Sequence, residues 1–410
     1  MTAATTETSW HSAAEQDLIR SFGPRMAMFV RGEGAYLWDE QGTRYLDFLA
    51  GIAVTSLGHA HPVFVDAVSR QAATLAHVSN FFATPPQLEL VARLKRIAGT
   101  GPGGRVFLAN SGAEANEAAF KLARLHGAAS DTAGARPRIL ALNNAFHGRT
   151  MGTLALTGKP AMREPFAPMV PGVEFIDATI EALERACDQR VAALFVEPVQ
   201  GEAGVRELPA GYLAAAREIT HQHGALLIVD EIQTGAGRTG AWFGFQHAGI
   251  TPDAITLAKG MGGGFPVGAL VTFPAAAELF TPGSHGSTFG GNPLAAAVAN
   301  AVLAEIEHAE LIGNAAARGS QLRARIDAIG SPLVSGCRGL GLLIGVALTA
   351  PVAPDVVRAA QERGLVINAP NAETIRLVPA LTIGDAEIDE FATLFSSALQ
   401  SVSETVGKAS

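Results

Sequence analysis

One lysine stands where an apolar run ends and a glycine-rich loop begins. The run AITLA (254–258) is typical of a buried strand, and Lys259 follows it directly, ahead of GMGGG. A buried ammonium is unfavourable unless it is paired or loses its proton. A lysine whose pKa is lowered in this way can attack an aldehyde and form an imine with it. The position of Lys259 therefore predicts a chemical role for its amine.

A carboxylate occupies the corresponding place one unit earlier in the chain. Asp230 follows the apolar run ALLIV (225–229) and precedes Lys259 by 29 residues. This separation fits one strand–helix–strand unit, so we expect the two residues at neighbouring strand ends. A buried carboxylate needs a positive partner, and an aspartate so placed can hold a pyridine nitrogen in its protonated form. An N-cap for a following helix is the alternative.

The segment after the first predicted strand combines a helix start with small residues. In NSGAEANE (110–117), Ser111 and Glu114 fit a capping box, in which each side chain accepts a backbone amide. Gly112 and Ala113 leave the amides of the first helical turn open to an anion, which the helix dipole also favours. The segment predicts a phosphate site, with plain helix capping as the alternative.

An aromatic ring and a guanidinium follow the second predicted strand. Phe146 and Arg149 lie in FHGRT (146–150). A flat ring can lie on a planar ligand, and a guanidinium can grip a carboxylate with two hydrogen bonds. Core packing for Phe146 and a solvated helix start for Arg149 are the alternatives. His147, between them, is more typical of a structural hydrogen-bonding residue than of a catalyst.

Six short apolar runs must position these side chains. They alternate with stretches of helical pattern and comprise RVFLAN (105–110), RILALNN (138–144), VAALFVEP (191–198), ALLIVDE (225–231), AITLAK (254–259) and GALVTF (268–273). This alternation predicts a doubly wound α/β sheet with helices on both faces. In such a sheet, ligands bind at the carboxyl ends of the strands, where the residues above stand.

The flanking regions predict further elements. Residues 35–48 have the pattern of a hairpin, and residues 61–78 that of an amphipathic helix. From residue 292 onward, the pattern indicates a smaller α+β lobe of two long helices, a glycine-rich strand (338–348), a helix through Arg363, a strand (374–381) and a final helix from Asp385. We therefore divide the chain into an N-terminal segment (1–65), a large domain (66–290) and a C-terminal small domain (291–410).

Composition narrows the class of protein and its partners. The 410 residues are 48% hydrophobic and 17% charged, as in an ordinary globular enzyme, and 30 basic against 38 acidic residues give a net charge of −8. No basic footprint for nucleic acid is present. Apolar runs are far shorter than the roughly 20 residues that span a bilayer. We expect neither nucleic acid nor a membrane as partner.

Cysteine usage and the N-terminus favour a cytoplasmic protein. Cys187 and Cys337 allow one disulfide at most, and we expect both to be free thiols in a reducing compartment. The first residues, MTAATTETSWHSAAEQ, have neither a basic start nor an apolar core, so no signal peptide is expected. Two H-x-H pairs, at 59–61 and 221–223, lack further ligands nearby, so we expect no metal site.

The cofactor pyridoxal 5'-phosphate requires a lysine that forms an imine, a buried aspartate and a helix start that binds an anion. The ordered segments NSGAEANEAA, FHGRT, VEPVQGEAGV, DEIQTGAGRTG, LAKGMGGG and HGSTFGGNP also resemble class III aminotransferases of the fold-type I pyridoxal-phosphate superfamily. The resemblance spans nearly the whole chain, from LDFLAGIAV to IRLVPAL. It implies a mostly parallel seven-stranded sheet between helices, plus a smaller α+β domain.

The resemblance implies a role for each matching residue of the cofactor site. Lys259 corresponds to the Schiff-base lysine and proton carrier, and Asp230 to the partner of the pyridine nitrogen. The remaining cofactor-binding positions are Gly112 and Ala113 at the phosphate, Phe146 on the ring, Gln233 at the ring hydroxyl, Glu231 and Ile232 in the same segment, and Thr288 from a neighbouring subunit. A homodimer with shared active sites is therefore expected.

The same resemblance implies how one pocket serves two substrates. Arg149 corresponds to the arginine that holds the substrate α-carboxylate, and Ser287 to a contact from across the interface. Glu202 and Arg376 are expected to pair for the amino donor and to separate for 2-oxoglutarate, which carries a second carboxylate. Without the resemblance, each reads as an ordinary loop salt-bridge residue. Glu197, in VEPVQG, belongs to this group of motifs without a predicted role.

The expected reaction is the transfer of an amino group from N2-acetyl-L-ornithine to 2-oxoglutarate, which yields glutamate, as a step of arginine biosynthesis. Enzymes that act on free ornithine tend to carry tyrosines where this chain has Ile52 and Ser79, which favours the acylated donor. Ornithine, succinylornithine and 4-aminobutyrate stay as alternative donors. The rival classes are a glutamate-1-semialdehyde aminomutase, a non-catalytic binding protein and a dinucleotide-dependent oxidoreductase. The sequence lacks a full G-x-G-x-x-G motif, which argues against the oxidoreductase.

Overall fold

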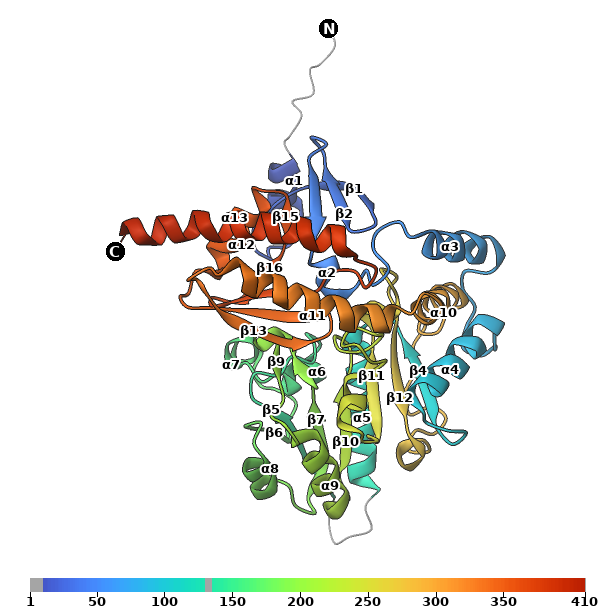
Figure 1. Cartoon of the computed structure of the whole chain (residues 1–410). Coiled ribbons are helices and arrows are strands. Elements are labelled where there is room, and N and C mark those ends of the chain that lie inside the picture. The colour runs from blue at the N-terminus through green and yellow to red at the C-terminus, as the bar shows by residue number, and fades with distance from the viewer. Residues whose placement is uncertain (1–9, 130–134, 410) are drawn as a thin grey trace.

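The computed structural model describes residues 10–129 and 135–409 (Figure 1). Most of the N-terminal stretch on which the absence of a signal peptide was predicted lies outside these residues. No helix within the described ranges is long and apolar enough to cross a membrane.

The centre of the fold is a seven-stranded sheet. Its order is β4-β12-β11-β10-β7-β5-β6, and β12 alone runs antiparallel to its neighbours. The strands are β4 (Arg105–Ala109), β5 (Arg138–Leu142), β6 (Val173–Ile176), β7 (Val191–Val196), β10 (Leu226–Asp230), β11 (Ala254–Leu257) and β12 (Gly268–Thr272). The six predicted strands are confirmed, as is the mostly parallel sheet.

The strand β6 was not predicted because it lacks an apolar run. It lies at the sheet edge beside β5 and contains Glu174, whose carboxylate receives two hydrogen bonds from Arg138. An edge strand can carry a charged residue since one side of it meets solvent. The alternation of apolar runs thus detected six of these strands and missed the edge strand that lacks such a run.

Successive residues of a central strand face two separate apolar clusters. Leu226 and Ile228 of β10 pack with the alanine-rich helix α5 (Gly112–Ala128), while Leu227 and Val229 pack in the cluster that includes α9 (Tyr212–His223). A parallel sheet with helices on both faces requires such continuous apolar strands. The run ALLIV therefore forms a buried strand whose next residue, Asp230, emerges at the sheet edge.

The C-terminal part builds a four-stranded antiparallel sheet of order β13-β14-β17-β16. Its elements are β13 (Val334–Leu340), β14 (Leu343–Leu348), β16 (Asn368–Asn371), β17 (Thr374–Leu377), α10 (Pro293–His308), α11 (Leu311–Ile329), α12 (Ala353–Gln361) and α13 (Asp385–Ala409). The prediction of a single strand over 338–348 was wrong. Gly341, at φ +54°, lies against the 239–240 backbone and turns the chain back, so that β13 and β14 form a hairpin.

The N-terminal strands join this C-terminal part. The strands β1 (Phe29–Glu33), β2 (Tyr36–Asp39) and β3 (Arg44–Asp47) form a sheet that β15 (Leu365–Val366) extends in parallel with β3. Figure 1 shows these elements and α13 together at one end of the molecule, away from α8 and α9. The predicted hairpin over 35–48 is confirmed as β2 and β3. The three-part division of the chain stays a prediction.

The remaining elements are short or connect the sheets. The helices are α1 (Trp10–Asp17), α2 (Ala50–Ala53), α3 (Pro62–Thr74), α4 (Pro85–Ala98), α6 (Met151–Leu156), α7 (Pro160–Arg163) and α8 (Ile180–Ala186), and the strands are β8 (Val199–Gln200) and β9 (Arg206–Glu207). The helix α3 confirms the amphipathic pattern of 61–78. The helix α10 packs against α3 and α4 beside the sheet.

Candidate active site

The carboxyl ends of β10 and β11 bring the two predicted chemical groups to one cavity. The strands pair in parallel with Asp230 opposite Thr256, three residues before Lys259. Both side chains line a cavity of about 450 Å³. The expectation that Asp230 and Lys259 occupy neighbouring strand ends is therefore confirmed.

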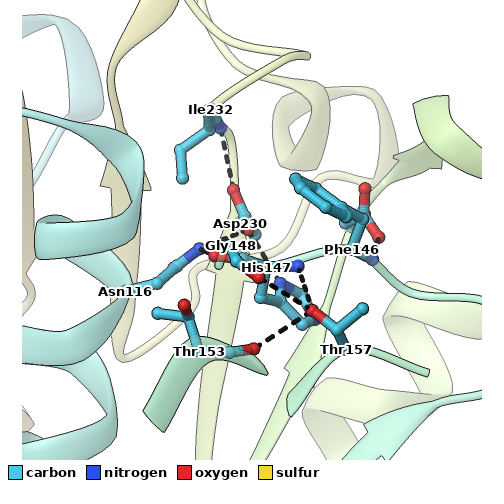
Figure 2. Close-up of polar contacts among 9 residues, drawn as sticks. Asn116, Phe146, His147, Gly148, Thr153, Thr157, Asp230 and Ile232 are labelled. Atoms are coloured by element: carbon cyan, nitrogen blue, oxygen red, sulfur yellow. Dashed lines mark hydrogen bonds and ion pairs between the residues drawn. The ribbon is translucent and has the colours of Figure 1, made fainter. Parts of the chain in front are cut away.

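Three donors fix the carboxylate of Asp230 (Figure 2). Asn116 Nδ2 and His147 Nδ1 lie 2.7 Å and 2.8 Å from Oδ2, and the Ile232 amide donates to Oδ1 at 3.0 Å. The last contact bridges a turn rather than the start of a helix, so the N-cap alternative was wrong. The carboxylate, 4% exposed, is held in one orientation at the cavity wall.

His147 supports Asp230 from beneath. Burial alone lowers the pKa of this imidazole, but the hydrogen bond and negative charge of Asp230 outweigh it, and the net pKa is raised. Its backbone amide donates to Thr157 Oγ1 at 3.2 Å, which fixes the loop. The predicted structural role of His147 agrees with this placement.

Asn116 is a site residue that the sequence analysis missed. It lies on α5, fully buried among alanines, and its Nδ2 also donates to the His147 carbonyl at 2.8 Å. An amide on the apolar face of an alanine-rich helix is costly to bury without partners. That mismatch, visible within NSGAEANEAA, was the available signal.

Lys259 enters the cavity from a strained backbone. Its φ is +44°, a region that residues other than glycine rarely adopt and that often occurs at functional sites. Burial lowers the pKa of its amine, and Arg376 lowers it further, against the opposing effect of Glu202, Asp230 and Glu197. Within the described ranges, no hydrogen bond or ion pair holds the amine, which leaves it available as a nucleophile and base.

The start of α5 forms one wall of the cavity. Ser111 Oγ accepts the Glu114 amide at 3.1 Å, as predicted, but the Glu114 carboxylate reaches one residue further back than a capping box, to the amide of Asn110 at 2.8 Å. The amides of Gly112 and Ala113 take part in neither contact, and first-turn amides have no partner within the helix. A Cβ on Gly112 would lie 2.8 Å from Ile232 Cδ1, so a larger residue would press on the wall of the cavity.

Phe146 and Arg149 lie at the same cavity. The Phe146 amide donates to Glu197 Oε1 at 2.9 Å, which ties this loop to the end of β7. The Arg149 guanidinium stands 5.7 Å from the Phe146 ring centre and is exposed. Among the residues described, Arg149 has no carboxylate partner, so it is free to bind an anion.

The segment after Asp230 divides between cavity and core. Ile232 and Gln233 line the cavity, but the side chain of Glu231 turns away from it. Glu231 accepts the amides of Gly244 and Phe245, each at 2.8 Å, and burial raises its pKa to about 7. Of this segment, the structure therefore brings Ile232 and Gln233, and not the Glu231 carboxylate, to the site.

Glu202 and Arg376 form an ion pair whose two charges act on the Lys259 amine. Arg376 Nη1 donates to Glu202 Oε1 at 2.5 Å, and its Nε donates to Asn368 Oδ1 at 3.1 Å. Burial raises the pKa of Glu202, but Arg376 more than compensates and the net pKa is lowered. Arg376 is 1% exposed, whereas Glu202 lines the cavity. The predicted pair is thus formed across the β17 strand and the turn after β8.

Ser287 and Thr288 are not brought to the cavity of their own chain. Ser287 Oγ accepts Asn110 Nδ2 at 3.3 Å, at the rear of the cavity wall. Thr288 is exposed and lines a separate surface hollow with Asn80 and Phe81. Neither side chain therefore completes the cofactor site within one chain.

The cavity fits a flat, phosphate-bearing molecule that carries an aldehyde. Its walls contain helix-start amides, an aromatic ring, a fixed carboxylate and an amine with a lowered pKa. A fold-type I sheet with this arrangement defines the class of pyridoxal-phosphate enzymes. The aminotransferase class-III family model matches residues 20–399, and the chain belongs to this pyridoxal-phosphate-dependent family.

Known proteins agree with this assignment. The chain is 49% identical over 390 residues to acetylornithine aminotransferase of Mycobacterium bovis, covering 95% of this chain and 96% of that protein. N-acetylornithine aminotransferase of Stenotrophomonas maltophilia is 36% identical, with a TM-score of 0.82 over 93% and 98% of the two chains. Ornithine aminotransferase of Toxoplasma gondii, crystallised with partial occupancy of PLP at its active site, is 34% identical, with a TM-score of 0.91 over 98% and 96%.

Proposed function

We propose that the chain transfers the terminal amino group of N2-acetyl-L-ornithine to 2-oxoglutarate, forming N-acetyl-L-glutamate 5-semialdehyde and L-glutamate in arginine biosynthesis. The observation that carries the proposal is the ion pair of Glu202 and Arg376, because Glu202 lines the same cavity as Arg149, which has no carboxylate partner among the described residues. One free guanidinium suits a donor with a single carboxylate. A second guanidinium, that of Arg376 after Glu202 has separated from it, suits an acceptor with two carboxylates.

The cavity residues fit pyridoxal phosphate in defined roles. When bound, this cofactor supplies an electron sink that stabilises negative charge on the carbon next to the substrate nitrogen. Gly112 and Ala113 offer amides to its phosphate, and Phe146 offers a flat apolar surface to its ring. Asp230, whose carboxylate is fixed by three donors, would hold the ring nitrogen of the cofactor. Gln233 offers its amide to the ring hydroxyl.

Lys259 serves as the attachment point and the proton carrier. Burial and Arg376 both favour its uncharged form, which is the form that accepts a proton. Its carboxylate neighbours oppose this effect, so that the protonated form stays accessible. An amine balanced in this way can take a proton from a substrate carbon and return it.

Two arginines determine which carboxylates bind. Arg149 is exposed at the cavity mouth and holds the carboxylate common to every substrate. Arg376 stays neutralised by Glu202 while the donor, with one carboxylate, is bound. For 2-oxoglutarate, Glu202 leaves Arg376, whose fork then grips the second carboxylate.

The proposal includes a cytoplasmic homodimer with shared active sites. The exposed Thr288 is suited to completing the phosphate site of a second copy, and Ser287 stands beside it. Phe81 and Phe289 are 92% and 60% exposed in the single chain. Large exposed apolar side chains are typical of an interface. Free Cys187 and Cys337 thiols fit a reducing compartment.

The donor preference is tested by steady-state kinetics with 2-oxoglutarate as acceptor. Neither Ile52 nor Ser79 carries the phenol group that a tyrosine would extend toward a free α-amino group. We expect kcat/KM for N2-acetyl-L-ornithine to exceed that for L-ornithine by at least about tenfold, or about 1.4 kcal/mol. Succinylornithine and 4-aminobutyrate are measured in the same series. Equal values for the acetylated and free donors would contradict the proposal.

A requirement for 2-oxoglutarate separates this function from its closest rival. Glutamate-1-semialdehyde aminomutase moves an amino group within one molecule and needs no second carboxylate site. Formation of one glutamate per semialdehyde, dependent on 2-oxoglutarate, is the expected result. Turnover of glutamate-1-semialdehyde without an acceptor would favour the rival.

A further inference from the structure

A lysine that the proposed reaction does not use stands beside the ion pair of Glu202 and Arg376. Lys159 precedes α7, is half-buried, and its Nζ donates to the backbone carbonyl of Glu202 at 2.6 Å. Burial lowers the pKa of Lys159, the carboxylates of Glu202 and Glu197 raise it, and Arg376 and Arg149 lower it again. The ammonium therefore lies within the same charge cluster as both substrate-binding arginines.

The backbone of the turn that carries Glu202 is held from two sides. Lys159 holds the carbonyl of residue 202, and Arg338 Nε donates to the carbonyl of Gly204 at 2.8 Å. These contacts fix the turn between β8 and β9. When Glu202 separates from Arg376, the movement is therefore a rotation of its side chain and not a shift of the loop.

Arg376 keeps its place during this rotation. Its Nε remains on Asn368 Oδ1, while Nη1 carries the bond to Glu202 and a longer contact of 3.4 Å to Gln233 Oε1. At 1% exposure, the guanidinium has almost no access to solvent. A substrate carboxylate can replace Glu202 at Nη1 without moving Arg376.

The displaced carboxylate then needs a new partner. The side chain of Glu202 is 26% exposed in the cavity wall, and an unpaired carboxylate in such a place is unfavourable. Lys159 already donates a hydrogen bond to the backbone carbonyl of Glu202. Rotation of the Glu202 side chain can therefore bring its carboxylate to the Lys159 ammonium. Among the described residues, Lys159 forms no ion pair that would compete.

We propose that Lys159 is the counter-ion that receives the Glu202 carboxylate when a dicarboxylate occupies Arg376. Lys159 thereby determines the affinity for 2-oxoglutarate and glutamate, and leaves the affinity for monocarboxylate donors unchanged. This inference rests on the proposed function, since it assumes that the pocket accepts both kinds of substrate. Lys159 is a specificity residue that touches neither the reacting atoms nor the cofactor.

The test uses the holoenzyme and the variant Lys159→Gln. Glutamine keeps a donor for the Glu202 carbonyl and removes the charge. We expect the Kd of glutarate, an unreactive dicarboxylate, to rise about tenfold by calorimetry, while the Kd of pentanoate changes less than about twofold. The glutamate half-reaction should lose kcat/KM by the same factor, and Lys159→Arg should restore most of it. Equal losses for glutarate and pentanoate, or none, would overturn the inference.

Two controls separate a charge effect from a structural one. Lys95 also holds a backbone carbonyl, that of Pro102 at 2.9 Å, on the surface, and Lys95→Gln should leave both affinities unchanged. In a Glu202→Gln background no carboxylate needs a counter-ion, so Lys159→Gln should have no further effect on glutarate. A full additional loss in the double variant would overturn the proposal.

A crystal structure with glutarate gives a direct readout. Glu202 Oε within hydrogen-bonding distance of Lys159 Nζ is expected, and a Glu202 carboxylate turned to solvent would contradict the inference. The glutarate measurement does not depend on the identity of the amino donor. Failure of N2-acetyl-L-ornithine as a substrate therefore tests the proposed function alone, and an unchanged glutarate affinity tests Lys159 alone.

Discussion

At the residue scale, the site works by burying charged groups beside one another. Asp230 is fixed by three donors, whereas in the described part of the chain the Lys259 amine has no hydrogen-bond or ion-pair partner and Glu197 accepts one hydrogen bond, from the Phe146 amide. Burial therefore has different consequences for the three groups. Burial lowers the pKa of the Lys259 amine and raises that of the Glu197 carboxyl, so each shifts toward its neutral form.

Glu197 makes this difference measurable through the pH dependence of stability. Burial raises its pKa to about 7 in the folded protein, against the opposing effect of His147. Because the folded state then binds a proton more tightly than the unfolded state, the protein loses stability as pH rises from about 4.5 to 7. The loss is up to about 3 kcal/mol.

We expect Glu197→Gln, which still accepts the Phe146 amide, to abolish this part of the decline. Calorimetric melting of both holoenzymes between pH 4.5 and 7 provides the measurement. The melting temperature of the wild type should fall relative to that of the variant as pH rises. Parallel curves would show that the pKa of Glu197 does not differ between the folded and unfolded states, which would contradict the prediction.

At the element scale, the start of β12 positions the N-terminal end of α5, where we propose that phosphate binds. Gly268 pairs with Ala109 of β4, and a Cβ on Gly268 would lie 2.3 Å from the carbonyl oxygen of Ser111. Both groups belong to the backbone, so no side chain can rotate to relieve the contact. The strand therefore fixes the turn from which the amides of Gly112 and Ala113 project.

Gly268→Ala is expected to displace that turn. The affinity for pyridoxal phosphate should fall by more than about tenfold, and the protein should lose about 2 kcal/mol or more of stability. Equilibrium dialysis and thermal melting measure the two effects. Gly313→Ala is the matched control, because Gly313 lies inside α11 with open space around it, and alanine there should stabilise by up to about 1 kcal/mol. Wild-type cofactor affinity in Gly268→Ala would contradict the assignment of this turn.

At the scale of the whole molecule, we propose that a second copy of the chain completes the site. Thr288 lies outside its own cavity, next to exposed aromatic rings. If two chains share their sites, then a defect in Lys259 and a defect in Thr288 affect the same site only when they come from opposite subunits. This property distinguishes a shared site from two independent ones.

Mixing two inactive variants tests the shared site. Lys259→Ala and Thr288→Glu should each be nearly inactive, the second because its carboxylate repels phosphate. Random subunit exchange should restore about one quarter of wild-type activity, since each mixed dimer then contains one intact site. Thr251→Glu, at an exposed position before β11, should stay active. Mixed dimers without restored activity, or a monomer by light scattering, would contradict the proposal.

The sequence by itself predicted most strands of the central sheet and the edge at which Asp230 and Lys259 lie. Continuous apolar runs such as 225–229 can only be buried on both faces, so each polar residue that ends one must emerge at the carboxyl edge. Asp230 and Lys259 were placed in this way from their spacing. The same logic missed β6 and merged the ends of β13 and β14 into one strand over 338–348, because an edge strand tolerates charge and a tight glycine turn interrupts no apolar run.

Only the tertiary structure decided which side chains meet. Asn116 on α5 reaches Asp230, Glu231 turns into the core, and Lys159 reaches the carbonyl of Glu202 across 43 residues of sequence. Such contacts join elements that the chain order does not make adjacent, and each depends on the exact crossing of a helix or loop with the sheet. Local periodicity fixes where a residue leaves its strand, whereas packing between elements fixes what it touches.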